Sequence, residues 1–169
     1  MDIFGWLTDP SNWSGPGSIP FQTAMHLLYS LIALAVAAAI AIPLGIFIGH
    51  TGKGESFIMG SVNAMRALPT LGLLILLVLI IAPTFSNNLA FVIPSLIVLV
   101  LLAVPPILSG VASGIRAIDR SVIDAARGMG FSTWQVIFRI EVPCALPLTL
   151  SGVRGATLQI VSTATVAAY

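Results

Sequence analysis

The sequence predicts an all-α protein: a polytopic bundle of transmembrane helices in one domain that covers residues 1–169. Its 169 residues are 57% hydrophobic and 8% charged, with a mean hydropathy of +1.06. Soluble domains are about 45–50% apolar and about 25% charged. The apolar residues also gather in long stretches, and the few basic residues fall between alternate stretches. These observations together indicate a multi-pass protein of a cell membrane.

Four stretches are long enough to cross a bilayer. A spanning helix needs roughly 20 apolar residues, because each adds about 1.5 Å across a core of about 30 Å. The stretches cover about residues 24–49, 57–82, 89–113 and 143–169. Prolines 43, 69, 94, 105 and 106 interrupt them, so we expect kinked helices, either as ordinary irregularity or as the bent lining of a pathway.

The basic residues predict the orientation of the chain, because Lys and Arg favour the cytoplasmic side of short loops. Lys53 and Arg66 lie near the first connection, and the third carries the set Arg116, Arg120, Arg127 and Arg139. The first twenty residues and the turn at 83–88 contain no Lys or Arg. We therefore expect the N-terminus outside, with no cleavable signal sequence before the first span.

The composition excludes several classes of function. A net charge of +1 creates no field that would gather nucleic acid. One cysteine and two distant histidines supply neither a disulfide framework, nor a metal site, nor a nucleophilic triad. The chain has no G-x-x-x-x-G-K-[ST] phosphate loop. We therefore expect no catalytic residues, no metal and no cofactor bound by this chain.

The segment at about 116–142 differs in character from the spans. Asp119 can cap a short amphipathic helix that runs to Ala126 and ends at Gly128 or Gly130. Ser132 and Gln135 then form a capping-box pattern for a second helix, which we expect to stop near Pro143. This pattern alone is equally typical of a helix that lies in the membrane interface.

The residue spacing of this segment resembles the EAA loop of ABC importer permeases. The matching residues are Asp124, Ala125, Ala126, Gly130, Ile140 and Pro143. Asp124 departs mildly from the usual glutamate. The resemblance implies a type I ABC importer permease fold, in which this loop forms a coupling helix that docks on a cytoplasmic ATPase. Gly130 would permit the sharp turn after that helix.

Longer stretches look like the glycine betaine/carnitine/choline permeases, among them WLTDPSNWSGPGSIP, RALPTLGLL and LLAVPPILSG. The resemblance implies an osmoprotectant importer with a second permease subunit, alike or different, two ABC ATPases that use the ATP, and an external solute-binding protein. Relatives of this kind continue with a further helix, so we expect the chain to lack a C-terminal part. A permease for methionine or another amino acid, and a truncated scaffold that transports nothing, are the alternatives.

A few polar residues within the spans are candidates for a translocation pathway. Arg154 stands inside the fourth span, where a charge usually faces a cavity or a partner, although snorkelling to the interface is an equal alternative. Thr157 and Gln159 nearby favour a buried polar face. His26 is expected to be structural, and His50 to lie just in the cytoplasm. The scattered aromatic residues, Tyr29 and Phe91 among them, do not suggest a cage for a quaternary ammonium group, which we expect in the binding protein.

Overall fold

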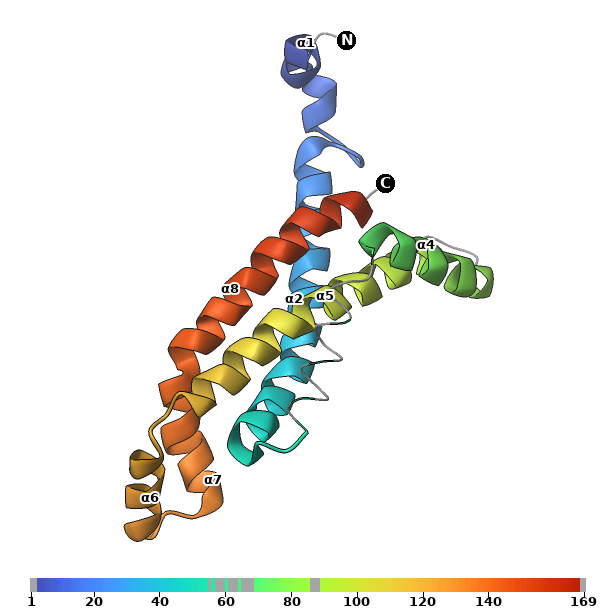
Figure 1. Ribbon diagram of the computed structural model, residues 1–169. Coiled ribbons are helices and arrows are strands. Elements are labelled where there is room, and N and C mark those ends of the chain that lie inside the picture. Colours follow the sequence, from blue (N-terminus) through green and yellow to red (C-terminus); the bar gives the residue numbers. More distant parts are fainter. Residues whose placement is uncertain are drawn as a thin grey trace.

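The computed structural model describes residues 3–54, 56, 60, 64, 69–85 and 89–167, and within these ranges every regular element is helical (Figure 1). The elements in chain order are α1 (Ile3–Thr8), η1 (Pro10–Trp13), α2 (Ile19–Thr51), α4 (Thr70–Ile81), η2 (Ala82–Thr84), α5 (Leu89–Arg116), α6 (Arg120–Gly128), α7 (Thr133–Val136), η3 (Ile137–Glu141) and α8 (Val142–Ala167).

Three helical runs are long and apolar enough to cross a membrane: α2, α5 and the run Thr133–Thr165 that ends in α8. They cover the first, third and fourth expected spans. The second expected span is represented by the shorter α4, of 12 residues, while most of 57–68, Arg66 included, lies outside the described residues. In Figure 1, α2 and α8 cross α5 as long rods, and α4 projects to one side of them.

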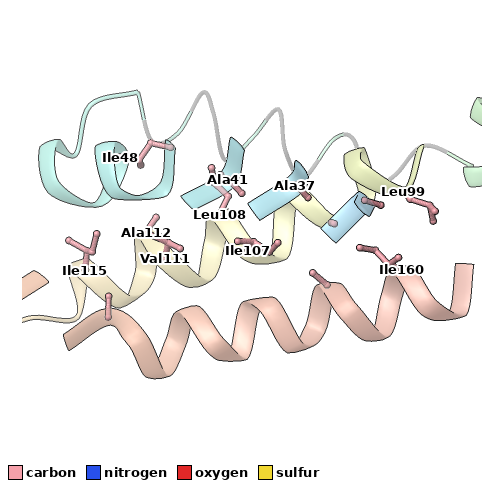
Figure 2. Packing of buried hydrophobic residues seen from close by; sticks show 14 of the residues in the cluster. Ala37, Ala41, Ile48, Leu99, Ile107, Leu108, Val111, Ala112, Ile115 and Ile160 are labelled. Atoms are coloured by element: carbon pink, nitrogen blue, oxygen red, sulfur yellow. The ribbon is translucent and has the colours of Figure 1, made fainter. Parts of the chain in front are cut away.

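The core of the bundle forms where α2, α5 and α8 meet (Figure 2). On α2, Ala33, Ala37 and Ala41 are fully buried and lie four residues apart, so they form one stripe along the helix. Ile107 and Leu108 of α5 and Ile160 of α8 fill the space against this stripe. Small residues on one face and a few large ones on the facing helix are typical of helix packing in membranes.

Helices α5 and α8 approach so closely that their backbones are in contact. A Cβ atom added at Gly110 would lie 2.6 Å from the carbonyl oxygen of Leu148, and one at Gly152 would lie 2.5 Å from the carbonyl oxygen of Pro106. No real Cβ atom tolerates such distances to a backbone atom. The two glycines are therefore required by the crossing itself, and not by any unusual backbone angle.

The contact between α2 and α5 depends on glycine in the same way, though against side chains. A Cβ atom at Gly45 would lie 2.7 Å from Cβ of Val111. One turn further along, a Cβ atom at Gly49 would lie 2.8 Å from Cβ of Ile115. The C-terminal half of α2 is thus held directly against the end of α5.

The prolines of the spans lie inside continuous helices. Pro43 stands within α2, and Pro94, Pro105 and Pro106 stand within α5. Pro94 and Pro105 are among the most deeply buried side chains of the bundle. Pro69, in contrast, is the N-cap of α4. The neighbouring helices therefore support α5 where the prolines remove its own hydrogen bonds.

The α5–α8 contact predicts that Gly152→Ala destabilises the bundle, whereas Gly155→Ala does not. Overpacking against backbone costs about 1–3 kcal/mol, while an alanine at Gly155 would meet nothing closer than Cβ of Pro106 at 4.0 Å. The measurement is the thermal unfolding midpoint of each variant in one detergent. Equal midpoints for the two variants would contradict the close crossing.

Candidate coupling surface

Helix α6 begins at a side-chain cap. Asp119 precedes it with extended backbone angles, and its Oδ1 accepts a hydrogen bond of 2.9 Å from the backbone N–H of Ser121. This hydrogen bond satisfies one of the free amides at the start of the helix. The same amide, followed by the side chain of Ser121, holds the pKa of Asp119 below its ordinary value. The expected cap is confirmed, and it fixes where α6 starts.

Helix α6 ends in a Schellman motif centred on Gly130. The N–H of Gly130 donates to the carbonyl oxygen of Arg127 at 2.9 Å, and the N–H of Phe131 donates to that of Ala126 at 3.1 Å. Gly130 has φ of +86°, in the left-handed region that side chains disfavour. No atom lies within 4 Å of a Cβ placed there, so the requirement for glycine comes from the backbone angle alone. The predicted turn at Gly130 is confirmed.

The next helix begins with the predicted capping box. The N–H of Gln135 donates to Oγ of Ser132 at 3.4 Å, and Oε1 of Gln135 accepts from the N–H of Ser132 at 2.8 Å. Both hydrogen bonds of the box are therefore formed. Helix α6 is thus followed, after a turn of four residues, by a helix with an equally well-defined start.

The expectation that this second helix stops near Pro143 was wrong. The chain continues from α7 through the π-helical turn η3 into α8 without a break. In a regular α-helix the ring of Pro143 would collide with the carbonyl of Arg139, four residues earlier. Arg139 lies within η3, and the wider winding of a π turn moves that carbonyl aside. One rod therefore joins α7 to the last span.

Apolar side chains are exposed beside α6. Val122 and Met129 of α6 project outward, and Met129 is 71% exposed. Trp134 and Phe138 lie next along the chain, are also exposed, and stack on each other with ring centroids 5.9 Å apart. Large apolar groups gathered at the surface mark a protein or membrane contact. These four side chains are called the coupling surface below.

The residues predicted to couple to an ATPase divide into two groups. Asp124 and Ala125 are exposed on α6, whereas Ala126 is buried and 1% exposed. Ile140 and Pro143 lie at the base of the α8 rod, half-buried and exposed respectively. Only Ala125 is thus free to allow a close approach from outside, while the small size of Ala126 serves the packing of α6 on its own chain.

Beneath α6 lies a hydrogen-bonded pair of side chains that the sequence did not reveal. Nδ1 of His50, in the last turn of α2, lies 2.8 Å and 2.9 Å from the two carboxylate oxygens of Glu141 in η3. Their side chains are 15% and 6% exposed. His50 was expected only to lie just in the cytoplasm. The two residues are 91 positions apart, so no local pattern could have paired them.

His50 and Glu141 also line a cleft of about 460 Å³ between the ends of α2 and α5 and the inner side of α6. Asp124 lies at the rim of the same cleft, with Arg120 and Arg127 of α6. Acidic and basic side chains therefore line the same cleft, on the inner side of α6. Figure 1 shows α6 and α7 together at the end of the bundle away from both chain ends.

The pathway candidates lie on more than one face of α8. Successive residues of a helix are rotated by about 100°, so Thr157 and Gln159 point about 160° apart. The hydroxyl of Thr157 donates to the carbonyl oxygen of Val153 at 2.9 Å and is thus occupied locally. Arg154 is exposed on the surface of α8. A role of Arg154, Thr157 and Gln159 in a translocation pathway stays a prediction.

Arg154 belongs to a stripe of exposed residues along α8. Helical spacing places six exposed residues within about 100° of one another. They are Ser151, Arg154, Gly155, Leu158, Ser162 and Thr165. This set is called the α8 stripe below. Five of its six residues are polar, charged or glycine, a composition that does not suit contact with lipid tails.

Comparison with known proteins agrees with these features. A family model described as "Binding-protein-dependent transport system inner membrane component" matches residues 41–169. The chain is 31% identical over 148 residues to the carnitine transport permease protein OpuCB of Listeria monocytogenes. The aligned region covers 88% of this chain and 65% of that protein. The chain therefore spans slightly less than two-thirds of that relative.

Two further relatives extend the comparison. The chain is 29% identical over 153 residues to the glycine betaine/carnitine/choline transport system permease protein OpuCB of Bacillus subtilis, covering 90% of this chain and 67% of the relative. It is 28% identical over 132 residues to the glycine betaine/proline betaine transport system permease protein ProW of Escherichia coli, covering 78% and 35%.

The His50–Glu141 pair predicts an unequal result for two substitutions. His50→Leu leaves a buried carboxylate without its partner and should destabilise the bundle by about 1–3 kcal/mol. Glu141→Gln keeps a hydrogen-bonding group beside His50 and should cost less. Thermal unfolding midpoints of both variants, and of the double variant His50→Leu/Glu141→Leu, measure the difference. A double variant no more stable than His50→Leu alone would show that the pair is not coupled.

Proposed function

This chain belongs to the family of binding-protein-dependent transport system inner membrane components, and on that premise we propose that it is the membrane-spanning permease subunit of an ABC importer for glycine betaine, carnitine or choline. The proposed substrate class is the one for which the relatives are named. The observation that carries the proposal is α6, which has the EAA-like spacing, a defined cap at each end and an exposed apolar surface beside it.

In this proposal the coupling surface docks on a partner ABC ATPase. Met129, Trp134 and Phe138 would supply the apolar contact, because all three side chains are mostly exposed at this end of the bundle. Asp124, Ala125 and Gly130 would set the approach and the turn of α6. The ATPase would bind and hydrolyse ATP, while this chain would hold no cofactor and catalyse no reaction.

The proposed orientation places α6 in the cytoplasm and the N-terminus outside. The described basic residues other than Arg154 support it, because they gather at the α6 end of the bundle: Lys53, Arg116, Arg120, Arg127 and Arg139. This distribution follows the preference of Lys and Arg for the cytoplasmic side. An external solute-binding protein would then deliver the substrate at the end that carries α1.

We assign the α8 stripe to the face that meets a second permease subunit or the pathway between the two. A charged group in a spanning helix costs about 2.5 kcal/mol or more in lipid, so it is placed against protein or water. Arg154 lies along one edge of this exposed stripe. Thr157 and Gln159, on other faces of α8, would then help to position the helix and would not line the same surface.

The test is ATP-dependent uptake of labelled glycine betaine, carnitine and choline into proteoliposomes that contain the permease, its ATPase and its binding protein. We expect saturable uptake of at least one of them. Uptake of methionine or another amino acid in their place would identify a different substrate. Correct insertion without uptake of any solute would indicate a scaffold.

Gly130→Ala should uncouple the importer, because alanine at φ of +86° costs about 1–2 kcal/mol and shifts α6 on the ATPase. Gly128→Ala is the matched control, since Gly128 has ample space and no positive φ. We expect several-fold less uptake per ATP hydrolysed for Gly130→Ala only, with normal insertion of both variants. An equal ratio of uptake to hydrolysis in the two variants would argue against a coupling role.

If Arg154 faces a pathway or a partner, Arg154→Leu should reduce uptake by about tenfold or more, because the charge is lost. The variant should still insert, since leucine carries no penalty in lipid. Arg154→Lys keeps the charge and should retain part of the activity. The measurements are uptake and the thermal midpoint of the assembled complex. Normal uptake by Arg154→Leu would instead place the guanidinium at the membrane surface.

A further inference from the structure

A second hollow of about 350 Å³ lies at the opposite end of the bundle from the coupling surface. Gln22, His26 and Tyr29 of α2 line one side, Phe91 and Ser95 of α5 another, and Ala164 of α8 a third. Its volume lies within the range of small-molecule sites, about 300–1,000 Å³. In the proposed orientation, this is the end at which a substrate enters.

The lining of this hollow combines aromatic rings with neutral hydrogen-bonding groups. Tyr29 and Phe91 are 62 positions apart in the sequence, and only the packing of α2 on α5 brings both to one hollow. Both rings line the hollow. Aromatic rings attract cations through their quadrupole, so they suit a ligand with a cationic group.

The polar groups of the hollow suit the other end of a zwitterion. The side chains of Gln22 and His26 line it without a hydrogen bond to any described residue, and each has a nitrogen that can donate to a carboxylate. No Asp or Glu lines it. A metal ion or a polyamine would need such carboxylates, whereas a quaternary ammonium ion, which has no N–H to donate, does not.

A much smaller space adjoins the hollow. Leu99, which is 2% exposed, and Ser95 line both the hollow and this space of about 10 Å³ toward α4. A single water needs about 10–15 Å³, so the smaller space holds no solute. The hollow of about 350 Å³ is called the chamber below.

We propose that this chamber is a transient subsite for a quaternary ammonium solute, in which Tyr29 and Phe91 contact the cation while Gln22 and His26 bind its carboxylate or hydroxyl. The proposal rests on the proposed osmoprotectant function and adds a recognition site within the permease itself. The scattered aromatic residues of the sequence thus contribute a partial cage once the helices are packed.

The experiment measures binding of labelled tetramethylammonium to the permease–ATPase complex in nanodiscs, without the binding protein. Tyr29→Leu and Phe91→Leu should each raise the Kd about two- to thirtyfold, the range that a cation–π contact supplies. Tyr29→Phe and Phe91→Tyr keep a ring and should bind nearly as the wild type does. Phe47→Leu is the matched control, because Phe47 is an exposed aromatic residue of α2 outside the chamber.

A competitor separates cation recognition from simple apolar binding. The isostere of glycine betaine in which carbon replaces the quaternary nitrogen, 3,3-dimethylbutanoate, keeps the shape and the carboxylate but has no cationic group, so it should not displace tetramethylammonium at equal concentration. Equal competition, an unchanged Kd in the leucine variants, or no binding by the wild type would each overturn the proposal. If a leucine variant does not assemble, Tyr29→Met or Phe91→Met, which keeps apolar volume at that position, provides the same comparison.

Uptake by the wild-type importer distinguishes this proposal from the function on which it rests. Betaine uptake with the binding protein, but no tetramethylammonium binding without it, would leave the importer assignment intact and remove the subsite. Ring-dependent binding without uptake of any betaine would leave the subsite intact and remove the assigned substrate. Absence of both would remove both.

Discussion

The backbone contact between α5 and α8 is the constraint on which the remainder of the bundle depends. Lipid tails are as apolar as leucine, so spanning helices gain little by hiding apolar side chains from them and associate through close packing instead. Gly110 and Gly152 allow that packing, because neither position has room for a single additional carbon. The crossing lies in the second half of α5 and near the middle of α8, so it constrains the positions of both ends of α8.

Toward the end that holds α6, the rod of α8 continues through η3 into α7 and carries Trp134 and Phe138 of the coupling surface. The His50–Glu141 pair joins this rod to the last turn of α2. In the proposed function, a displacement of Trp134 or Phe138 by a docked protein would be transmitted along this continuous helix. Because the backbones of α5 and α8 touch at Gly110 and Gly152, α5 would be displaced together with α8.

Toward the other end, the same crossing leaves a space that side chains do not fill. The outer turns of α2, the start of α5 and the end of α8 surround the chamber lined by Tyr29 and Phe91. Helix α5 contributes Leu99 to this chamber and Gly110 to the glycine crossing, so a shift of α5 would alter both. In the proposed function, α5 and α8 would therefore link the two proposed sites.

Local chemistry was sufficient to predict several features from the sequence. Apolar length predicted the spans at α2, α5 and α8, and side-chain caps at Asp119 and Ser132, with glycine at position 130, predicted the short helices between the last two spans, because each needs only residues within a few positions. Which distant groups meet depended instead on the packing of the helices. Packing paired His50 with Glu141 and placed Tyr29 and Phe91 at one hollow, and a π turn carries the last helix past Pro143. Contacts between helices depend on the angle at which they cross, and that angle is set by packing between residues far apart in the chain.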